Sequence, residues 1–379
     1  MNEQSHWAEI TKAHRIVLKV GTSTLTRDGR LRPDKFTGLA RDVACLMEAG
    51  KEVVIVSSGA IAVGAHRLGW DHSGESVREK QAAAAVGQIG LIELYQRRFA
   101  KRGRHVGQVL LTRLGLEEHT RFMNARHTIL ELLRLGVVPI VNENDTVATE
   151  EIRFGDNDNL AATIVNAVEA DLLVILTDVE GLYERAPEAG KPTPPLIRTV
   201  DRITPKIKAA ASGAGTRFGS GGMITKLQAA QTAARSGAAT VLCHGKTSNV
   251  LQKLIAGEIH GTLFAPAERL HVRKHWIAFT AKTRGRIVID EGATIALEKR
   301  GGSLLPAGVL RVEGRFEIGD SVSCVNESAR EVARGLVGYS SKDVSALAGQ
   351  STKEIGRVLG YSNGEEIIHR DDLVLVGQE

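Results

Sequence analysis

The chain has 379 residues, of which 42% are hydrophobic and 25% charged, and its formal net charge is +5. This composition is typical of a globular protein, and the length allows two or three domains with a large core. No apolar run is long enough to span a membrane, the first ten residues lack the apolar centre of a signal peptide, and the three cysteines are widely spaced. We therefore expect a cytoplasmic protein with no disulfide framework, no cysteine-based metal site and no membrane segment.

The positive charge is unevenly distributed along the chain. Residues 271–379 contain 15 Lys+Arg and 15 Asp+Glu, so the surplus lies in the first 270 residues. Binding to a nucleic-acid backbone depends on neutralising phosphates, which a neutral C-terminal stretch does not favour. A phosphate-binding site within the first 270 residues would account for part of the surplus.

Short apolar runs alternate with helical segments over the first part of the chain. Strands are predicted at residues 15–20, 51–56, 105–111, 137–141, 171–176 and 239–243, and helices at 34–49, 79–97, 121–135, 158–169 and 223–236. The strands are rich in Val, Ile and Leu without polar alternation, which predicts an α/β fold with a mostly parallel sheet between helices. After about Pro266, apolar runs at 286–290, 309–313 and 321–325 between Gly-rich turns predict a small β-rich domain.

Two clusters of acids and amides lie at positions where ligands commonly bind. Asn142-Glu-Asn-Asp-Thr146 follows a predicted strand, and Phe154-Gly-Asp-Asn-Asp-Asn159 precedes a predicted helix. Ligands of open α/β sheets bind beyond the carboxyl ends of strands and at helix N-termini. Each cluster alone also fits a solvated turn with an Asp N-cap. Together they favour a pocket for a ligand that carries an ammonium group, or for a metal ion.

Glycine- and serine-rich loops supply candidate anion sites, although no Walker A or Rossmann motif is present. Lys19-Val-Gly-Thr-Ser23 begins near the end of a predicted strand, and Ser57-Ser-Gly-Ala60 and Thr177-Asp178 follow predicted strands. The segment Gly219 to Lys226 opens a helix, where backbone amides and the lysine can hold a phosphate. Two lysines, a glycine-rich helix start and an acidic cluster at one sheet edge suit phosphoryl transfer, which needs cations and a fixed acceptor more than covalent participation.

The order of these motifs is shared with a known family. The motifs are Lys19-Val-Gly-Thr-Ser23, Ser57-Ser-Gly-Ala60, Asn142-Glu-Asn-Asp-Thr146, Phe154-Gly-Asp-Asn-Asp158, Thr177-Asp178 with Gly181-Leu-Tyr183, and Gly221-Gly-Met-Ile-Thr-Lys226. Residues 14–264 closely resemble the glutamate 5-kinases, a branch of the amino-acid kinase family. The remainder resembles the PUA domain that many bacterial members carry. One small departure is Ser220, where Thr is common, and the hydroxyl is retained.

The resemblance implies a domain organisation. We expect an amino-acid kinase domain over residues 1–264, a linker over 265–284, a PUA domain over 285–363 and a C-terminal segment over 364–379. It also implies ATP-dependent phosphorylation of the γ-carboxylate of L-glutamate, the first step of proline synthesis, with Mg²⁺. Feedback inhibition by proline and a homodimer or homotetramer are implied as well.

The resemblance further implies roles for individual residues. Lys19 and Lys226 would stabilise the transferring phosphoryl group, and Asp158 would orient these two lysines. Glutamate would be bound by Ser58, Asp145 and Asn157. ATP would be bound by Lys19, Thr177, Asp178, Ser220, Gly221, Gly222, Met223, Ile224, Thr225 and Lys226. For Asn142 and Asp156, direct ligand contact and support of other ligand-binding residues remain open alternatives.

Two other functions compete with this interpretation. A different amino-acid kinase, such as an acetylglutamate or aspartate kinase, would share the phosphate-binding residues and differ in its acceptor. A chain whose main role is RNA binding through the C-terminal domain is less favoured, because residues 271–379 are electrically neutral.

Overall fold

The structure is a computed structural model of the chain. It describes residues 3–147, 157–188, 190–212, 222–258, 260–267 and 272–376. The chain forms two compact units, residues 1–116 with 120–269 and residues 117–119 with 270–379. Each unit contains its own sheet and its own hydrophobic core.

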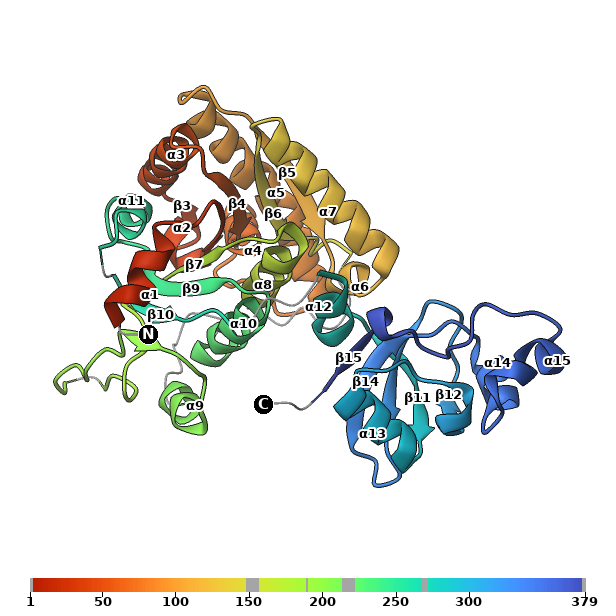
Figure 1. Ribbon diagram of the computed structural model, residues 1–379. Helices are drawn as coiled ribbons and strands as arrows, with labels where there is room; N and C mark the ends of the chain where they lie inside the picture. The colour runs from red at the N-terminus through yellow and green to blue at the C-terminus, as the bar shows by residue number, and fades with distance from the viewer. Residues whose placement is uncertain are drawn as a thin grey trace. The chain divides into compact units, whose positions relative to one another are not determined.

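The large unit is built on an eight-stranded sheet in the order β5-β6-β4-β1-β7-β9-β10-β8 (Figure 1). Its strands are β1 (Arg15–Val20), β4 (Glu52–Ser57), β5 (Val106–Leu111), β6 (Val138–Glu143), β7 (Leu172–Thr177), β8 (Thr199–Val200), β9 (Ala239–His244) and β10 (Thr262–Phe264). Among the described strands, neighbours are parallel except for the antiparallel pair β9 and β10. The predicted mostly parallel α/β sheet is confirmed.

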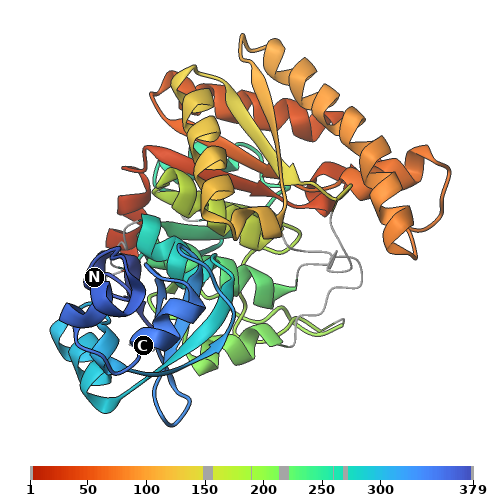
Figure 2. The same cartoon turned by 90° about the vertical axis from the view of Figure 1, so that its right-hand side faces the viewer.

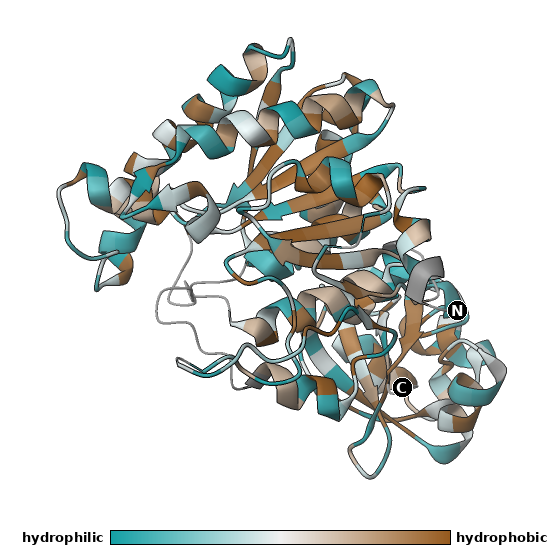
Figure 3. Cartoon of the chain, turned by 90° about the vertical axis from the view of Figure 1, so that its left-hand side faces the viewer, coloured by the Kyte–Doolittle hydropathy of each residue, from teal (hydrophilic) through white to brown (hydrophobic). Residues whose placement is uncertain are grey.

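Helices cover both faces of this sheet (Figure 2). One core contains residues of α1 (Glu3–Ile10), α3 (Pro33–Glu48), α5 (Val77–Ala100) and α11 (Val250–Ile255). The core on the other face contains residues of α7 (His119–Arg134), α8 (Asn157–Val168) and α10 (Met223–Arg235). The strands between these two cores are apolar along most of their length (Figure 3), because both of their faces are buried.

Shorter elements connect the layers of the large unit. They are α2 (Thr22–Leu25), β2 (Thr26–Arg27), β3 (Arg30–Leu31), α4 (Ala60–Arg67), α6 (Arg113–Leu116) and α9 (Pro205–Ser212). The long helix α5 begins two residues before its predicted start because Ser76 and Glu79 form a capping box. No helix in the described part of the chain is long and apolar enough to cross a membrane.

The small unit combines a five-stranded sheet with short helices. The sheet has the order β12-β11-β13-β14-β15. The elements of this unit are α12 (Val272–Phe279), β11 (Thr283–Ile289), α13 (Glu291–Arg300), η1 (Pro306–Gly308), β12 (Val309–Gly314), β13 (Ser321–Val325), β14 (Glu331–Leu336), α14 (Ser341–Leu347), η2 (Thr352–Glu354), α15 (Ile355–Leu359), η3 (Arg370–Asp372) and β15 (Leu373–Leu375). The β-rich character is confirmed, whereas the α-helices among the described residues of this unit were not predicted from the sequence.

Two glycines bring α4 and α5 into close backbone contact. A Cβ at Gly64 would lie 1.7 Å from the backbone oxygen of Ala83, and one at Gly87 would lie 1.8 Å from that of Ala60. The contact positions the start of α4, which directly follows the Ser58-Gly59 turn. These two helix positions therefore require glycine, because there is no room for a Cβ between the helices, despite the low helix propensity of glycine.

Gly87→Ala should consequently destabilise the large unit. The added methyl group forces the two helices apart, and we expect a loss of about 1–3 kcal/mol or more. Gly38→Ala is the matched control, because Gly38 lies within α3 and a Cβ there meets nothing within 4 Å. We expect that control to be neutral or stabilising by up to about 1 kcal/mol. Urea unfolding measures both, and equal midpoints for the two variants would contradict the close contact.

Candidate active site

Lys19 lies near the carboxyl end of β1, in the middle of the large sheet. Its neighbours Leu18 and Val20 pack into the core on one face, so the Lys19 side chain points to the other face, which α8 and α10 cover. Only 6% of Lys19 is exposed. An ammonium group buried to this degree requires a counter-charge.

Asp158, the second residue of α8, provides this counter-charge. It is fully buried, and its Oδ1 lies 2.7 Å from Nζ of Lys19. Its Oδ2 lies 3.3 Å from Nζ of Lys226 in α10 and accepts a hydrogen bond of 2.8 Å from Oγ1 of Thr225. The structure therefore gathers the three residues predicted to be catalytic around one carboxylate, from three separate elements.

The charges of this group do not cancel, because two ammonium groups share one carboxylate. Burial alone would raise the pKa of Asp158, but the ammonium groups of Lys19 and Lys226 outweigh it and hold the pKa below its usual value. Burial lowers the pKa of Lys226, although the Asp158 carboxylate opposes this shift. Two buried ammonium groups held side by side are electrostatically suited to an anion such as a phosphoryl group.

A network of side-chain amides joins the ends of β4 and β6 to the start of α8. Nδ2 of Asn157 donates to the backbone oxygen of Ser57 (3.2 Å), to Oγ of Ser58 (2.9 Å) and to Oδ1 of Asn142 (3.1 Å). Nδ2 of Asn142 donates in turn to Oε1 of Gln88 in α5, at 2.9 Å. Two of the predicted glutamate-binding residues, Ser58 and Asn157, are thus in direct contact.

Two polar atoms of this network make no hydrogen bond with the described residues. Nε2 of Gln88 and Oδ1 of Asn157 are buried and have no hydrogen-bond partner among the described residues. An unsatisfied buried donor or acceptor is costly, so both atoms are candidates for contact with a ligand or a water molecule. The hydroxyl of Tyr95 donates to Oγ of Ser57 at 3.1 Å and fixes the end of β4 beneath the network.

Asp145 lies apart from these contacts. Its side chain is partly buried, and it has no hydrogen-bond or ion-pair partner in the described ranges that flank residues 148–156. Burial raises the pKa of its carboxyl group to about 6. A desolvated carboxylate with no partner among the described residues is suited to bind an ammonium group.

The predicted nucleotide-binding residues are only partly described. Thr177 ends β7, and its Oγ1 donates to Oδ1 of Asp178 at 3.0 Å. The Asp178 carboxylate also acts to raise the pKa of Lys226, which places it near the cluster around Asp158. Gly222 caps the N-terminus of α10 with extended backbone.

The other predicted nucleotide-binding positions differ in how they are placed. Met223 is buried, whereas Ile224 is 49% exposed. Ser220 and Gly221 lie outside the described residues, as does the Phe154 to Asp156 part of the second acidic cluster.

Sequence reasoning missed Gln88 and Tyr95, and it ended one strand too early. Strand β6 continues through Asn142 and Glu143, because both residues pair with β5 rather than following the strand as predicted. Gln88 and Tyr95 both lie on α5. The available signal for Gln88 was a polar residue within an Ala-rich helix. The spacing of residues did not indicate that its partner is Asn142.

The described residues form no complete coordination site for a metal ion. They include no group of three or more His, Cys, Asp or Glu side chains that could hold one. Asp158 already binds two lysines and Thr225, so its carboxylate is occupied. These residues suit Mg²⁺ that is held chiefly by nucleotide phosphates and water, as is usual for this ion.

The chain was also compared with known proteins. Residues 14–244 match the model of the amino acid kinase family, and residues 285–359 match that of the PUA domain. The first match spans more than half of the chain, and the parallel sheet with its buried lysine pair agrees with it. The chain therefore belongs to the amino-acid kinase family, and more narrowly, as its relatives show, to the glutamate 5-kinases.

Those relatives resemble the chain over nearly its whole length. The glutamate 5-kinase of Cupriavidus taiwanensis is 50% identical over 97% of this chain and 99% of its own. That of Laribacter hongkongensis is 51% identical over 96% of this chain and 98% of its own. A solved isopentenyl phosphate kinase of T. acidophilum covers 66% of this chain and 99% of its own, with 16% identity and a TM-score of 0.47, which is too distant a likeness to add to the assignment.

Proposed function

We propose that this chain transfers the γ-phosphoryl group of ATP to the γ-carboxylate of L-glutamate, forming ADP and L-glutamyl 5-phosphate. The observation that carries the proposal is the buried group of Lys19, Asp158 and Lys226 beside the amide network. The first group has the charge to hold a phosphoryl group, and the second has the polar groups to hold an amino acid. Asn157 and Asp158 are adjacent in α8, so the start of this helix contributes to both the lysine group and the amide network.

The lysines act on charge that moves during the reaction. Phosphoryl transfer spreads negative charge over the equatorial oxygens of the moving group, and preorganised ammonium groups stabilise that charge. Asp158 keeps Lys19 and Lys226 near each other despite their mutual repulsion. The γ-carboxylate of glutamate is already ionised at neutral pH and needs no general base. Mg²⁺ arriving with ATP would neutralise phosphate charge.

The amino-acid side of the site recognises the two ends of glutamate. Asp145 pairs with the α-ammonium group, while Ser58 and Asn157 contact a carboxylate or hold the residues that do. This division separates glutamate from acetylglutamate, because an N-acetylated substrate has no ammonium group to pair with Asp145. Thr177, Asp178 and the segment from Ser220 to Lys226 bind ATP.

An acceptor assay tests the proposal directly. ADP release is measured with glutamate, acetylglutamate, aspartate and carbamate as acceptors, under otherwise identical conditions. We expect glutamate to give by far the highest kcat/KM. The absence of any preference for glutamate would refute the proposed substrate while leaving the phosphoryl-transfer chemistry intact.

The pH dependence of glutamate use should follow the ionisation of Asp145. Because burial raises its pKa to about 6, the carboxylate is lost as the pH falls through this value. We expect kcat/KM for glutamate to fall about tenfold per pH unit below pH 6 and to level off above it, since kcat/KM reports the free enzyme. Asp145→Asn should abolish this inflection and raise the glutamate KM.

A reference measurement separates Asp145 from the ionisation of ATP. The profile of kcat/KM for ATP, recorded at saturating glutamate, contains the titration of ATP but not that of the free Asp145 site. Identical pH profiles for wild type and Asp145→Asn would remove this residue from glutamate binding.

Gln88 should affect glutamate binding through Asn142 and Asn157. Gln88→Ala removes the acceptor that holds Asn142, leaving a buried amide unpaired, so we expect glutamate KM to rise about tenfold or more with little change in kcat. Gln88→Glu keeps an acceptor oxygen and should retain more of the affinity. Gln96→Ala, the same change at an exposed position of α5, should leave KM unaltered. Steady-state kinetics decide, and equal KM values for Gln88→Ala and Gln96→Ala would exclude the relay.

The proposal also covers regulation and assembly. Proline would act as a feedback inhibitor, and the chain would assemble as a homodimer or homotetramer. A cytoplasmic location is consistent with the three free thiols at Cys45, Cys243 and Cys324. Glutamate-dependent ADP release with and without proline tests the inhibition.

A further inference from the structure

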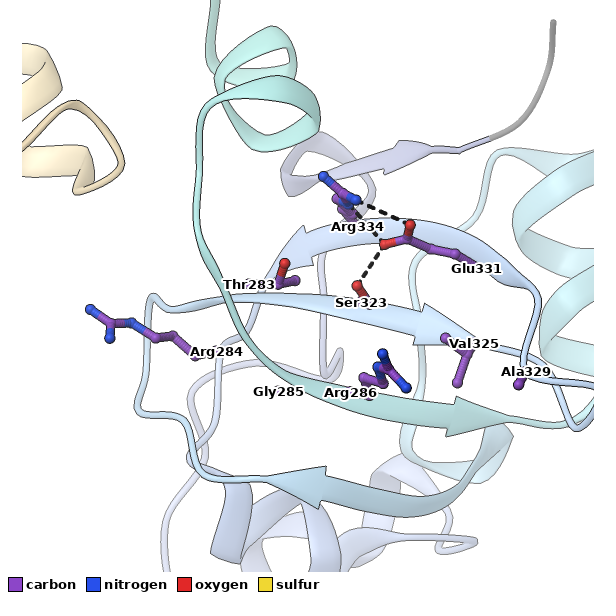
Figure 4. A pocket seen from close by; sticks show the side chains of 9 residues that line it. All are labelled: Thr283, Arg284, Gly285, Arg286, Ser323, Val325, Ala329, Glu331 and Arg334. Carbon is purple, nitrogen blue, oxygen red and sulfur yellow. Dashed lines mark hydrogen bonds and ion pairs between the residues drawn. The ribbon is translucent and has the colours of Figure 1, made fainter. Parts of the chain in front are cut away.

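The small unit contains a polar cavity of about 390 Å³ that the proposed kinase reaction does not use. It lies on the strands β11, β13 and β14 (Figure 4). Its polar lining residues are Thr283, Arg284, Arg286, Ser323, Glu331 and Arg334. This volume is within the range of sites that bind small molecules.

Strand register explains why these polar side chains converge. Arg286 pairs with Ser323, and Ser323 pairs with Arg334, so the three residues form one row across three strands. The next residues along each strand, Ile287 and Cys324 among them, are fully buried in the core of the unit. Because side chains alternate along a strand, the polar row lies on the face of the sheet opposite that core.

Part of the charge in the cavity is already paired. Glu331 accepts hydrogen bonds from Oγ of Ser323 at 2.5 Å and from Nε and Nη2 of Arg334 at 2.8 and 3.1 Å. Nη1 of Arg334 donates to the backbone oxygen of Ala278 at 3.1 Å. Figure 4 shows Glu331 linked to both of its side-chain partners. Burial alone would raise the pKa of Glu331, but these hydrogen bonds and the charges of Arg334 and Arg286 hold it below its usual value. Arg334 and Glu331 thus form a fixed polar wall, and Arg286 is close enough to act on the same carboxylate.

Arg284 and Arg286 leave the cavity with two positive charges. Neither guanidinium group has a hydrogen bond or ion pair with the residues described in this structure, and both side chains are exposed. Arg284 lies at a β-bulge between Thr283 and Gly285, and bulges redirect side chains. Gly285 between them faces the core, where a Cβ would lie 2.7 Å from the ring of Phe316, so both arginines belong to the outer face.

We propose that this cavity binds a small molecule that carries a phosphate monoester. The guanidinium group of Arg286 lies beside Ser323 and can bind two phosphate oxygens at once. Arg284 also lines the cavity, but its side chain extends away from Arg286 in Figure 4, so its charge acts from the end of the cavity. A dianion matches two unpaired arginines better than a monoanion does. Residues 271–379 as a whole are neutral, with 15 Lys+Arg, these two arginines included, and 15 Asp+Glu, so the positive charge of the cavity is local. A local surplus favours a compact anion over a nucleic-acid backbone, which needs an extended positive surface.

Hydrogen–deuterium exchange of the full-length protein tests this proposal with a local readout. We expect inorganic phosphate and AMP to slow exchange in peptides that cover residues 283–289 and 321–334. Arg286→Ser should weaken the protection by about tenfold or more in phosphate concentration, because a charge-assisted pair is lost. These peptides belong to the small unit and cover the cavity itself, so failure of the proposed kinase function would not explain a loss of this protection.

Arg311→Ser is the matched control. Arg311 lies on β12, pairs with Glu313 and does not line the cavity, yet its replacement removes the same charge from the same unit. Equal loss of protection in Arg286→Ser and Arg311→Ser would overturn the proposal in favour of a diffuse surface field. No protection by phosphate or AMP at any concentration would also overturn it.

Two further ligands distinguish the chemical class. Succinate offers two carboxylates in place of a phosphate, and a single-stranded RNA oligomer offers phosphate diesters. Protection by phosphate and AMP but not by succinate supports a phosphate monoester site. Stronger protection by succinate, or tight RNA binding that declines steeply with salt, would replace it with a dicarboxylate site or an RNA-binding surface.

Discussion

Lys226→Ala should lower kcat by about 10²–10³-fold while changing the glutamate KM only slightly. The ammonium group of Lys226 is held 3.3 Å from Asp158, ready for charge that develops on the phosphoryl group. An interaction that strengthens in the transition state appears in kcat rather than in KM. Lys19→Ala should behave in the same way, because Lys19 shares the carboxylate of Asp158.

Steady-state kinetics with controls separate this effect from loss of folding. Either variant leaves Asp158 with one lysine partner, so both proteins should remain folded. Lys12→Ala removes a charge that is exposed and paired with Glu9, and it should leave kcat unchanged. An unchanged kcat in both Lys19→Ala and Lys226→Ala would remove these lysines from the mechanism.

The sequence was informative wherever a local pattern determined the structure. The run Arg15–Val20 forms β1 at the predicted residues, because uninterrupted apolar runs are buried on both faces of a parallel sheet. Within that run, Lys19 is an ionisable residue in a strand that is otherwise apolar. Because a charged side chain is unfavourable in a buried strand, Lys19 was a candidate site residue. The glycines before Lys226 likewise marked the start of α10.

The sequence was uninformative where a contact depends on distant elements. The bond between Gln88 and Asn142 joins α5 to β6 across 54 positions, and nothing in the spacing of either segment indicates it. The row of Arg286, Ser323 and Arg334 depends on strand register, which β-bulges shift in this sheet.

The missed helices of the small unit have a different cause. Helix α13 spans ten residues, Glu291–Arg300, and shows little separation of polar and apolar sides. Its ends are set by caps instead. Asp290 accepts a hydrogen bond of 2.6 Å from the backbone nitrogen of Ala293, and Gly301 adopts a left-handed conformation. A prediction based on the periodicity of apolar residues therefore missed α13, whose ends are determined by capping residues.

Asp158→Asn should have the largest combined effect on activity and stability. The change keeps the shape of the side chain but takes from Lys19 and Lys226, each 6% exposed, the carboxylate that they share. Removing one member of a buried ion pair typically costs about 3–5 kcal/mol. We expect kcat to fall at least as far as in Lys226→Ala, because both lysines lose the group that orients them. Thermal unfolding and steady-state kinetics measure the two effects.

The electrostatic origin of this loss can be tested by restoring charge balance in two ways. Adding Lys226→Ala to Asp158→Asn removes one of the two uncompensated ammonium groups, so the double variant should be more stable than Asp158→Asn alone. Phosphate should raise the unfolding temperature of Asp158→Asn more than that of the wild type, because an anion replaces the missing carboxylate. If neither change restores stability, Asp158 contributes through its hydrogen bonds with Thr225 and Lys226 and not through its charge. If both do, Asp158 stabilises the large unit by its negative charge, which balances the two buried lysines.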